Sequence, residues 1–253
     1  MKKLLLSILI ASSLLSCSND EQSVVSNETA NTNKKELFIR NTDGKIVEEL
    51  PTEIYNKIIS DFRKSNDLEK IEILNSEYKN NNGVTKLIST VSKTAKSSLT
   101  GKTEAAITFQ YKAHISSYNY KDYRGIETSN QGGWQMWTDL GKEAGTTGYS
   151  ARLEALQFTS QVYINGFQAR AYVQNSGWLP YVGFGETVGT TGRSLRMEAL
   201  QIFVPSTFAT NVYYQVYVQN IGWMPSVNNG EVAGTMGQSL RIEAFKMYMF
   251  IVI

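Results

Sequence analysis

Three copies of one sequence pattern fill the C-terminal half of this 253-residue chain and constrain its fold more than any other feature. They read GWQMWTDLGKEAGTTGYSARLEALQF from Gly133, GWLPYVGFGETVGTTGRSLRMEALQI from Gly177 and GWMPSVNNGEVAGTMGQSLRIEAFKM from Gly222. In every copy a Gly-Thr pair follows the tryptophan at a constant distance, and an Arg and a Glu two residues apart follow that pair. The copies begin 44 and 45 residues apart, and a repeat of this length indicates one supersecondary unit per copy.

Each copy also contains a strand pattern. Apolar and polar residues alternate over 109–115, 167–173 and 212–218, which predicts half-buried β-strands. The strand after Gly-Thr carries Arg and Glu on one face and is expected to be covered on both sides. The first copy has an insertion, 117–130, which is rich in tyrosine and is expected to form a surface loop.

The repeats predict an all-β domain over 101–253, divided at about 108–160, 161–204 and 205–253. Three copies are too few for a propeller, which uses four or more blades. We therefore expect a closed domain with pseudo-threefold symmetry. A β-prism-like arrangement with one small sheet per repeat is favoured, and a β-trefoil is the alternative.

The N-terminus has the pattern of an export signal. Residues 1–16 combine two lysines with a short apolar run, which is typical of a secretory signal peptide and too short to span a membrane. The run ends in Leu-Leu-Ser-Cys, which resembles the bacterial lipobox, so Cys17 is expected to become a lipidated first residue. Two acyl chains would give firm membrane anchoring. An ordinary secreted protein is the alternative.

The segment between the leader and the repeats is polar and then charge-rich. Residues 17–35 are expected to be a disordered tether. Residues 36–100 are expected to form a small α+β or helical region of unknown role. It would contain a hairpin over 36–50, a helix starting at Pro51, a second helix over 68–74 and a third helix over 84–95.

Composition excludes several kinds of chemistry. The chain has one Cys and one His, so it has no disulfide of its own and too few ligands for a Cys/His zinc site, and any catalytic triad would depend on His114. Removing Lys2 and Lys3 with the leader brings the net charge of +2 to zero, which gives nucleic-acid binding no electrostatic support. We expect no metal, no cofactor and no enzymatic activity.

The repeated residues resemble a known family. The pattern GW…G…AGTTGQSLRIEA is similar to the clostridial hydrophobic repeat with a conserved tryptophan, ChW, over 109–253. Small departures occur at Tyr149, Ala151, Val188 and Met236. The resemblance implies an exported, surface-associated protein of a Gram-positive bacterium with a binding role. It implies no catalytic residues.

Aromatic residues of the repeats are the candidate ligand contacts. Trp134, Trp178 and Trp223 could stack on sugar rings, but a large residue kept in every repeat more often packs in the core. Trp137 has Tyr181 and Ser226 at the corresponding positions. This variation suggests partial exposure, which makes Trp137 and Tyr181 the better candidates for ligand contact.

The other repeated residues have structural explanations. The pairs are expected to bridge to a neighbouring strand or repeat rather than to bind a ligand; they are Arg152 and Glu154, Arg196 and Glu198, and Arg241 and Glu243. Gly-Thr-Thr-Gly lacks the lysine and helix of a phosphate-binding loop, so it predicts a turn with positive φ. His114 corresponds to Tyr172 and Tyr217 and is expected to be an exposed strand residue.

These expectations describe a lipoprotein anchored to the outer face of the cell membrane. Its repeat domain would bind a cell-wall or environmental glycan, or a protein partner. The alternative is a structural protein that docks onto other surface repeat proteins.

Overall fold

The computed structural model describes residues 37–42, 45–88, 108–121, 127–206 and 211–252. All of these described residues belong to one compact unit. The predicted leader, Cys17 and the tether lie outside the described residues. Within the described part of the chain, no helix is long and apolar enough to cross a membrane.

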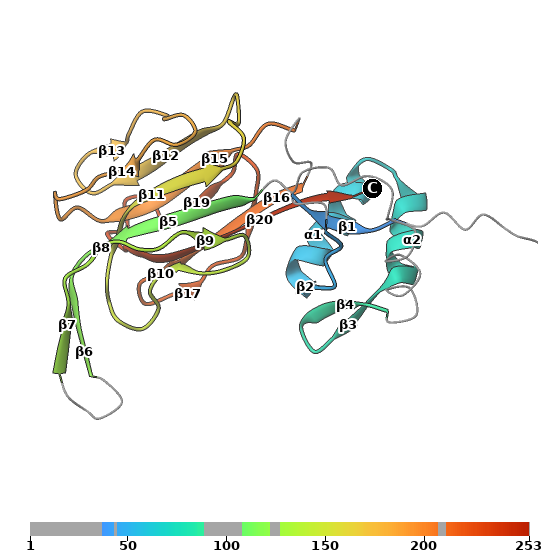
Figure 1. The fold of residues 1–253 in the computed structure, drawn as a ribbon, viewed down its shortest axis with the longest axis horizontal. Coiled ribbons are helices and arrows are strands. Elements are labelled where there is room, and N and C mark those ends of the chain that lie inside the picture. The colour runs from blue at the N-terminus through green and yellow to red at the C-terminus, as the bar shows by residue number, and fades with distance from the viewer. Residues whose placement is uncertain (1–36, 43–44, 89–107, 122–126, 207–210, 253) are drawn as a thin grey trace, which may run out of the picture. The chain divides into compact units, whose positions relative to one another are not determined.

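One pair of long antiparallel strands forms the centre of each repeat (Figure 1). The pairs are β5 (Phe109–Ile115) with β11 (Leu153–Ser160), β12 (Gln168–Val173) with β15 (Met197–Phe203), and β16 (Asn211–Val218) with β20 (Ile242–Val252). The predicted alternation is confirmed in β5, where every second side chain is buried. A two-residue strand with the repeat tryptophan pairs with the first strand in each copy; these are β8 (Gly133–Trp134), β13 (Gly177–Trp178) and β17 (Gly222–Trp223).

Each repeat also lends a short strand to a neighbouring repeat. Strand β10 (Ala144–Gly145) of the first repeat pairs with β20 of the third. Strand β14 (Val188–Gly189) of the second pairs with β11 of the first, and β19 (Val232–Gly234) of the third pairs with β15 of the second. The exchange therefore runs through all three repeats and returns to its start. The predicted all-β class is confirmed.

The three repeats share one hydrophobic core. Tyr111 of the first repeat lies edge-on against Phe245 of the third, with ring centroids 5.0 Å apart, and Phe158 contacts both rings. Met197 and Leu200 of the second repeat join the same cluster. Full burial of side chains of this size stabilises a fold by about 1.5–3 kcal/mol each, so the core couples the stability of each repeat to the others.

A β-bulge interrupts the second long strand of every repeat. The pairing register shifts at Glu154 in β11, at Glu198 in β15 and at Glu243 in β20. A bulge adds one unpaired residue and turns the local side chains. The expectation that Arg and Glu lie on one face of the strand after Gly-Thr assumed strict alternation, for example along 240–245. The bulge breaks this alternation at the glutamate.

The insertion in the first repeat is a hairpin and not the expected loop. Strand β6 (Tyr118–Lys121) pairs with β7 (Glu127–Asn130), and the two form a separate two-stranded sheet. Two more short strands complete the repeats, β9 (Thr138–Asp139) on β5 and β18 (Val227–Asn228) on β16.

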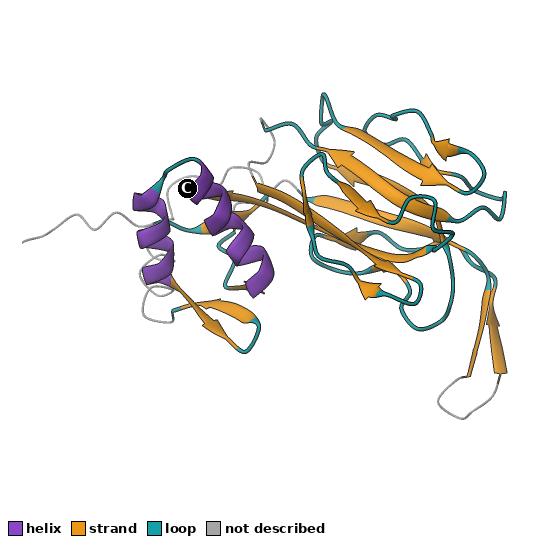
Figure 2. Cartoon of the chain, turned by 180° about the vertical axis from the view of Figure 1, so that it is seen from behind, coloured by secondary structure: helices purple, strands orange, loops and turns teal. Residues whose placement is uncertain are grey.

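The N-terminal region contains both helices of the described chain (Figure 2). Its elements are β1 (Ile39–Asn41), β2 (Glu49–Pro51), α1 (Thr52–Lys64), α2 (Leu68–Glu77), β3 (Tyr78–Asn81) and β4 (Val84–Leu87). The helices predicted after Pro51 and at 68–74 are confirmed. The helix predicted over 84–95 is wrong in its described part, because 84–87 form a strand. Asn82 and Gly83 both have positive φ and make the tight turn that joins β3 to β4.

This region packs on the third repeat. Strand β1 extends the third sheet by pairing with the end of β20, where Ile39 lies opposite Val252. Ile54 and Ile58 of α1 are buried in a second core with Tyr213 and Phe250 of the third repeat.

Candidate functional site

A lysine or arginine lies between two aromatic rings in each of the first two repeats. Lys112 Nζ is 4.8 Å from the ring centroid of Trp134 and 4.5 Å from that of Trp137. The Arg170 guanidinium carbon is 4.4 Å from the ring centroids of both Trp178 and Tyr181. A cation at this distance from an aromatic face is attracted by the ring quadrupole. We call each group, Lys112 with Trp134 and Trp137 or Arg170 with Trp178 and Tyr181, a cation–aromatic cluster.

The third repeat keeps the cation but supplies it from the opposite strand. Lys246 Nζ lies 4.2 Å from the ring centroid of Trp223. Lys246 is the direct cross-strand partner of Gln215, whereas in the other repeats the cation is on the first strand and glutamine is on the second; these pairs are Lys112 with Gln157 and Arg170 with Gln201. Each repeat thus has one cation and one glutamine at the same pair of sheet positions.

Every repeat tryptophan makes a T-shaped contact with an aromatic ring on the neighbouring strand. His114 meets Trp134 with an interplanar angle of 84°, and Tyr172 and Tyr217 meet Trp178 and Trp223 in the same way. The expectation that His114 is exposed is wrong, because only 16% of its side chain is accessible. Its Nδ1 lies 3.2 Å from Glu154 Oε2, so it is held between a ring and a carboxylate.

Packing of the repeat tryptophans in the core, the expectation that the repeat pattern favoured, is wrong. Trp134 is 38% exposed, and Trp178 and Trp223 are half-buried. All three lie on what we call the outer face of each sheet, the face turned away from the shared core. Trp137 and Tyr181 are exposed by 40% and 44%, which confirms the exposure predicted from their variation. The core positions are filled instead by the alternating side chains of the long strands.

The Arg and Glu residues of each pair bond to each other, and the expected bridge to a neighbouring strand or repeat is present in addition at Glu154, which contacts His114 of β5, and at Glu198. Arg152 Nε lies 2.7 Å from Glu154 Oε1, and the pairs Arg196 with Glu198 and Arg241 with Glu243 are 2.9 and 2.7 Å apart. Each glutamate is buried at the bulge. Glu198 also accepts a hydrogen bond from the Gly237 N–H of the next repeat, so a bridge between repeats exists there in addition. A buried carboxylate requires such partners.

The Gly-Thr segment fastens neighbouring repeats together. Gly189 has a φ of +105°, which confirms the predicted positive φ, and a Cβ there would lie 2.4 Å from the Glu154 carbonyl oxygen. The next N–H, of Thr190, donates to that same carbonyl at 3.0 Å. Gly145 and Gly234 repeat this close approach. The segment therefore has a structural role at the contact between repeats.

Family comparison agrees with this threefold geometry. The family model described as Clostridial hydrophobic W, or ChW, matches residues 129–159, 172–204 and 217–249. The chain carries three ChW repeats. Comparisons with curated proteins and with solved structures gave no match.

Several tyrosines behind the ChW sheets have raised pKa values. Burial, as the main cause, raises the pKa of Tyr213 and Tyr214 in β16 and of Tyr111 in β5. Burial also raises the pKa of Tyr55 on α1 to about 12. These hydroxyl groups hold the fold together: Tyr214 donates to the Glu231 carbonyl oxygen and Tyr213 to Asp61 Oδ2.

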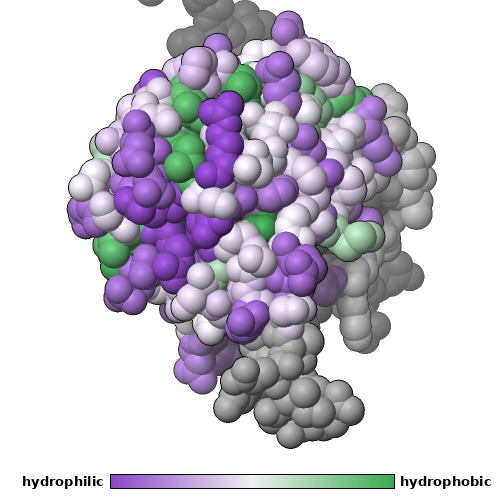
Figure 3. All heavy atoms as spheres, turned by 90° about the vertical axis from the view of Figure 1, so that its left-hand side faces the viewer, coloured by the Kyte–Doolittle hydropathy of each residue, from purple (hydrophilic) through white to green (hydrophobic). Residues whose placement is uncertain are grey.

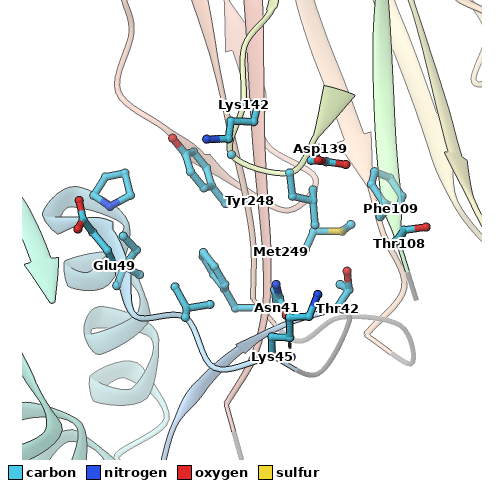
Figure 4. A pocket seen from close by; sticks show the side chains of 16 residues that line it. Asn41, Thr42, Lys45, Glu49, Thr108, Phe109, Asp139, Lys142, Tyr248 and Met249 are labelled. Atoms are coloured by element: carbon cyan, nitrogen blue, oxygen red, sulfur yellow. Dashed lines mark hydrogen bonds between the residues drawn. The ribbon is translucent and has the colours of Figure 1, made fainter. Parts of the chain in front are cut away.

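A cavity of about 530 Å³ lies where the N-terminal region meets the first and third ChW repeats. Figure 4 shows charged side chains around it, with Lys142 and Asp139 on one side, Lys45 opposite them and Glu49 between. Its charges are balanced and it is broadly open. No group of three or more His, Cys, Asp or Glu side chains in the described residues could hold a metal ion.

The end of the ChW domain at the left of Figure 1 is mainly hydrophilic (Figure 3). Hydrophobic residues appear on this face only as small separate spots. A large apolar patch, which marks many protein interfaces, is absent from this view of the described residues.

The cations of the clusters were missed by the sequence analysis. Lys112 and Arg170 stand at one repeat position where the third copy has Gln215, so comparing the copies column by column suggests no common role. The common cation becomes visible when the cross-strand partners are compared too, because Lys246, the partner of Gln215, supplies the positive charge in the third copy.

Proposed function

We propose that this protein is a non-catalytic surface protein whose ChW domain binds a glycan through the two cation–aromatic clusters. The observation that carries the proposal is the cation held between two partly exposed rings in each of the first two repeats. Aromatic faces suit the apolar faces of sugar rings, and exposed aromatic anchors often dominate binding energy.

Polar groups beside the rings support a sugar ligand. Gln201 Oε1 accepts hydrogen bonds from Arg170 Nε and the Tyr181 hydroxyl, at 2.9 and 2.8 Å. This network fixes the orientation of the ring and the guanidinium before a ligand arrives. Pre-ordered side chains reduce the entropic cost of binding.

The test is retention on cell-wall polysaccharide. Trp137→Ala with Tyr181→Ala is expected to weaken binding by roughly tenfold or more, since anchors of this kind contribute at least about 1–2 kcal/mol each. Met136→Ala is the matched control, because Met136 is next to Trp137 in the sequence and its side chain is 86% exposed. Unchanged retention of the double variant, with its folding intact, would remove both residues from the site.

A structural role in assembly is the second candidate. The observation that favours it is that the outer face of the third repeat already holds a protein element, helix α1. The first or second repeat could hold an element of another surface protein in the same way. Capture of a surface repeat protein, lost in the Trp137→Ala and Tyr181→Ala variant and without any signal on a glycan array, would favour this role.

We propose further that the protein is a lipoprotein on the outer face of the membrane of a Gram-positive bacterium. The lipobox-like sequence around Cys17 and the polar residues after it support this location. Cys17→Ser is expected to release the protein from the membrane fraction. A variant that stays membrane-bound would exclude anchoring through Cys17.

For the architecture, the closed exchange of strands supports the β-prism-like arrangement. In it each repeat contributes one sheet to a ring of three, and each sheet takes one short strand from another repeat.

A further inference from the structure

The cations in the first two repeats have no carboxylate partner among the residues that the structure describes. Lys246 of the third repeat lies 3.9 Å from Glu143 Oε2. Among the described residues, neither Lys112 nor Arg170 forms such an ion pair, although both are only partly buried. The two open clusters therefore each retain an uncompensated positive charge beside exposed aromatic rings.

Each cluster also has a free backbone donor. In the third repeat, the N–H of Ser226 donates to Glu53 Oε1 at 2.8 Å, and the Ser226 hydroxyl donates to the same oxygen at 2.7 Å. The corresponding N–H groups belong to Trp137 and Tyr181, and they donate to no atom of the described chain. One position of the repeat thus binds a carboxylate in the third copy, while in the other two it has no acceptor among the described residues.

The rest of each outer face differs between the occupied and the open repeats. Under α1 the third repeat has the apolar pair Tyr213 and Tyr248. The first repeat has Gln110 and Thr159 at these two positions, and the second has Gln168 with Phe203, which is 44% exposed. The amide and hydroxyl of the first repeat suit a polar chain better than the apolar side of a helix, and Phe203 offers a further ring face in the second.

We propose that the two clusters select acidic polysaccharides, with a sugar carboxylate at the N–H of Trp137 or Tyr181 and beside the cation. The sugar ring then lies on the exposed aromatic surface. Hydrogen bonds between a charged and a neutral group are about twice as strong as neutral ones, so the carboxylate adds selectivity to the stacking. This inference rests on the proposed glycan-binding function and names its substrate class.

The experiment compares the binding of an oligomer of hexuronic acid with that of its carboxyl-reduced, neutral form. The full-length chain is expected to bind the acidic oligomer at least tenfold more tightly, and the difference is expected to shrink as salt is added. Lys112→Gln with Arg170→Gln is expected to abolish the preference. Glutamine suits these positions because Gln215 occupies the corresponding place in β16.

Two controls separate local charge from general effects. Lys79→Gln with Arg193→Gln removes the same kinds of charge from exposed sites outside the clusters and is expected to keep the preference. Lys112→Gln with Gln157→Lys moves the cation to the partner strand, as in the third repeat. It is expected to restore selectivity at the first cluster when Arg170 is already replaced.

Each outcome has a distinct meaning. Equal binding of both oligomers, dependent on Trp137 and Tyr181, would overturn the selectivity while the glycan-binding function stands. No binding of either oligomer, or of neutral cell-wall polysaccharide, would overturn both. If oligoglutamate competes as well as the acidic oligomer, the clusters bind acidic protein segments, and the proposal that their ligand is a polysaccharide is overturned.

Discussion

At the scale of single residues, the three copies show which positions serve packing and which serve the surface. Gly145, Gly189 and Gly234 allow a neighbouring carbonyl to approach where a Cβ would clash. The cation and the glutamine can exchange strands, because only their joint position beside the tryptophan matters. The unchanged glycines therefore serve packing between repeats, while the compensated exchange of the cation and the glutamine indicates a shared surface role.

Gly189→Ala tests the close approach. The new Cβ would lie 2.4 Å from a backbone carbonyl at a φ of +105°, so we expect a loss of about 3 kcal/mol or more in unfolding free energy. Gly192→Ala is the matched control, since its φ is +69° but no atom lies within 4 Å, and it should cost only about 1 kcal/mol. Denaturant unfolding measures both. Equal losses would show that backbone strain alone, and not the contact between repeats, matters at this position.

The buried tyrosines predict a loss of stability in alkali. In the folded chain the pKa of Tyr55 is about 12, and the pKa values of Tyr213 and Tyr214 are raised as well. In the unfolded chain these tyrosines ionise near pH 10. The stability that depends on their neutral form is therefore fully present below pH 10, and it is lost as the pH rises toward the folded pKa values. Denaturant unfolding at stepped pH measures this, and constant stability above pH 10 would contradict it.

At the scale of elements, helix α1 shows how one outer face is occupied. Glu53 in its first turn accepts two hydrogen bonds from Ser226, and Asp61 two turns later accepts one from Tyr213. Ile54, Ile58 and Ile59 stand at helical spacing and therefore indicate a helix with one apolar side. They could not predict its partner, because that contact joins residues 173 positions apart.

Glu53→Gln tests this docking. The change removes the charge from two hydrogen bonds at a part-buried site, and we expect it to lower the unfolding free energy by about 1–2 kcal/mol. Glu72→Gln on the exposed side of α2 is the control and should have almost no effect. Thermal unfolding of the two variants measures the difference. If both behave alike, the Glu53 contact contributes little to docking.

Strand pairing shows where reading the sequence succeeds and where it stops. Alternation predicted the long strands because one face of each is buried throughout. It failed at Glu154, Glu198 and Glu243, since a bulge leaves no mark in a polar–apolar pattern. The tryptophans were expected in the core because of their size, yet the long strands already fill it. The asparagine and glycine at 82–83 were a hairpin signal that could have corrected the third helix.

At the scale of the whole molecule, the exchanged strands make the repeats interdependent. Each sheet lacks a strand unless another repeat supplies it, and β10 closes the cycle by pairing with β20. The shared core has the same effect. Stability is therefore expected to be all-or-none, unlike that of open repeat arrays whose units add nearly independently.

Deleting residues 205–253 tests this closure. The deletion removes β19 from the second sheet and leaves β10 without β20, so we expect the remaining fragment to lose cooperative unfolding altogether. The complete chain should unfold in one transition by both circular dichroism and tryptophan fluorescence. A truncated chain that keeps a sharp transition would show that two repeats suffice.

The exchange of strands does not require the three repeats to share a peptide chain. Ala144 and Gly145 need an edge on β20, and nothing in that pairing depends on the linkers between repeats. Separate single-repeat peptides that assembled in threes would satisfy the same hydrogen bonds. Joining the three repeats in one chain makes this assembly independent of concentration and lets each copy carry a different outer face.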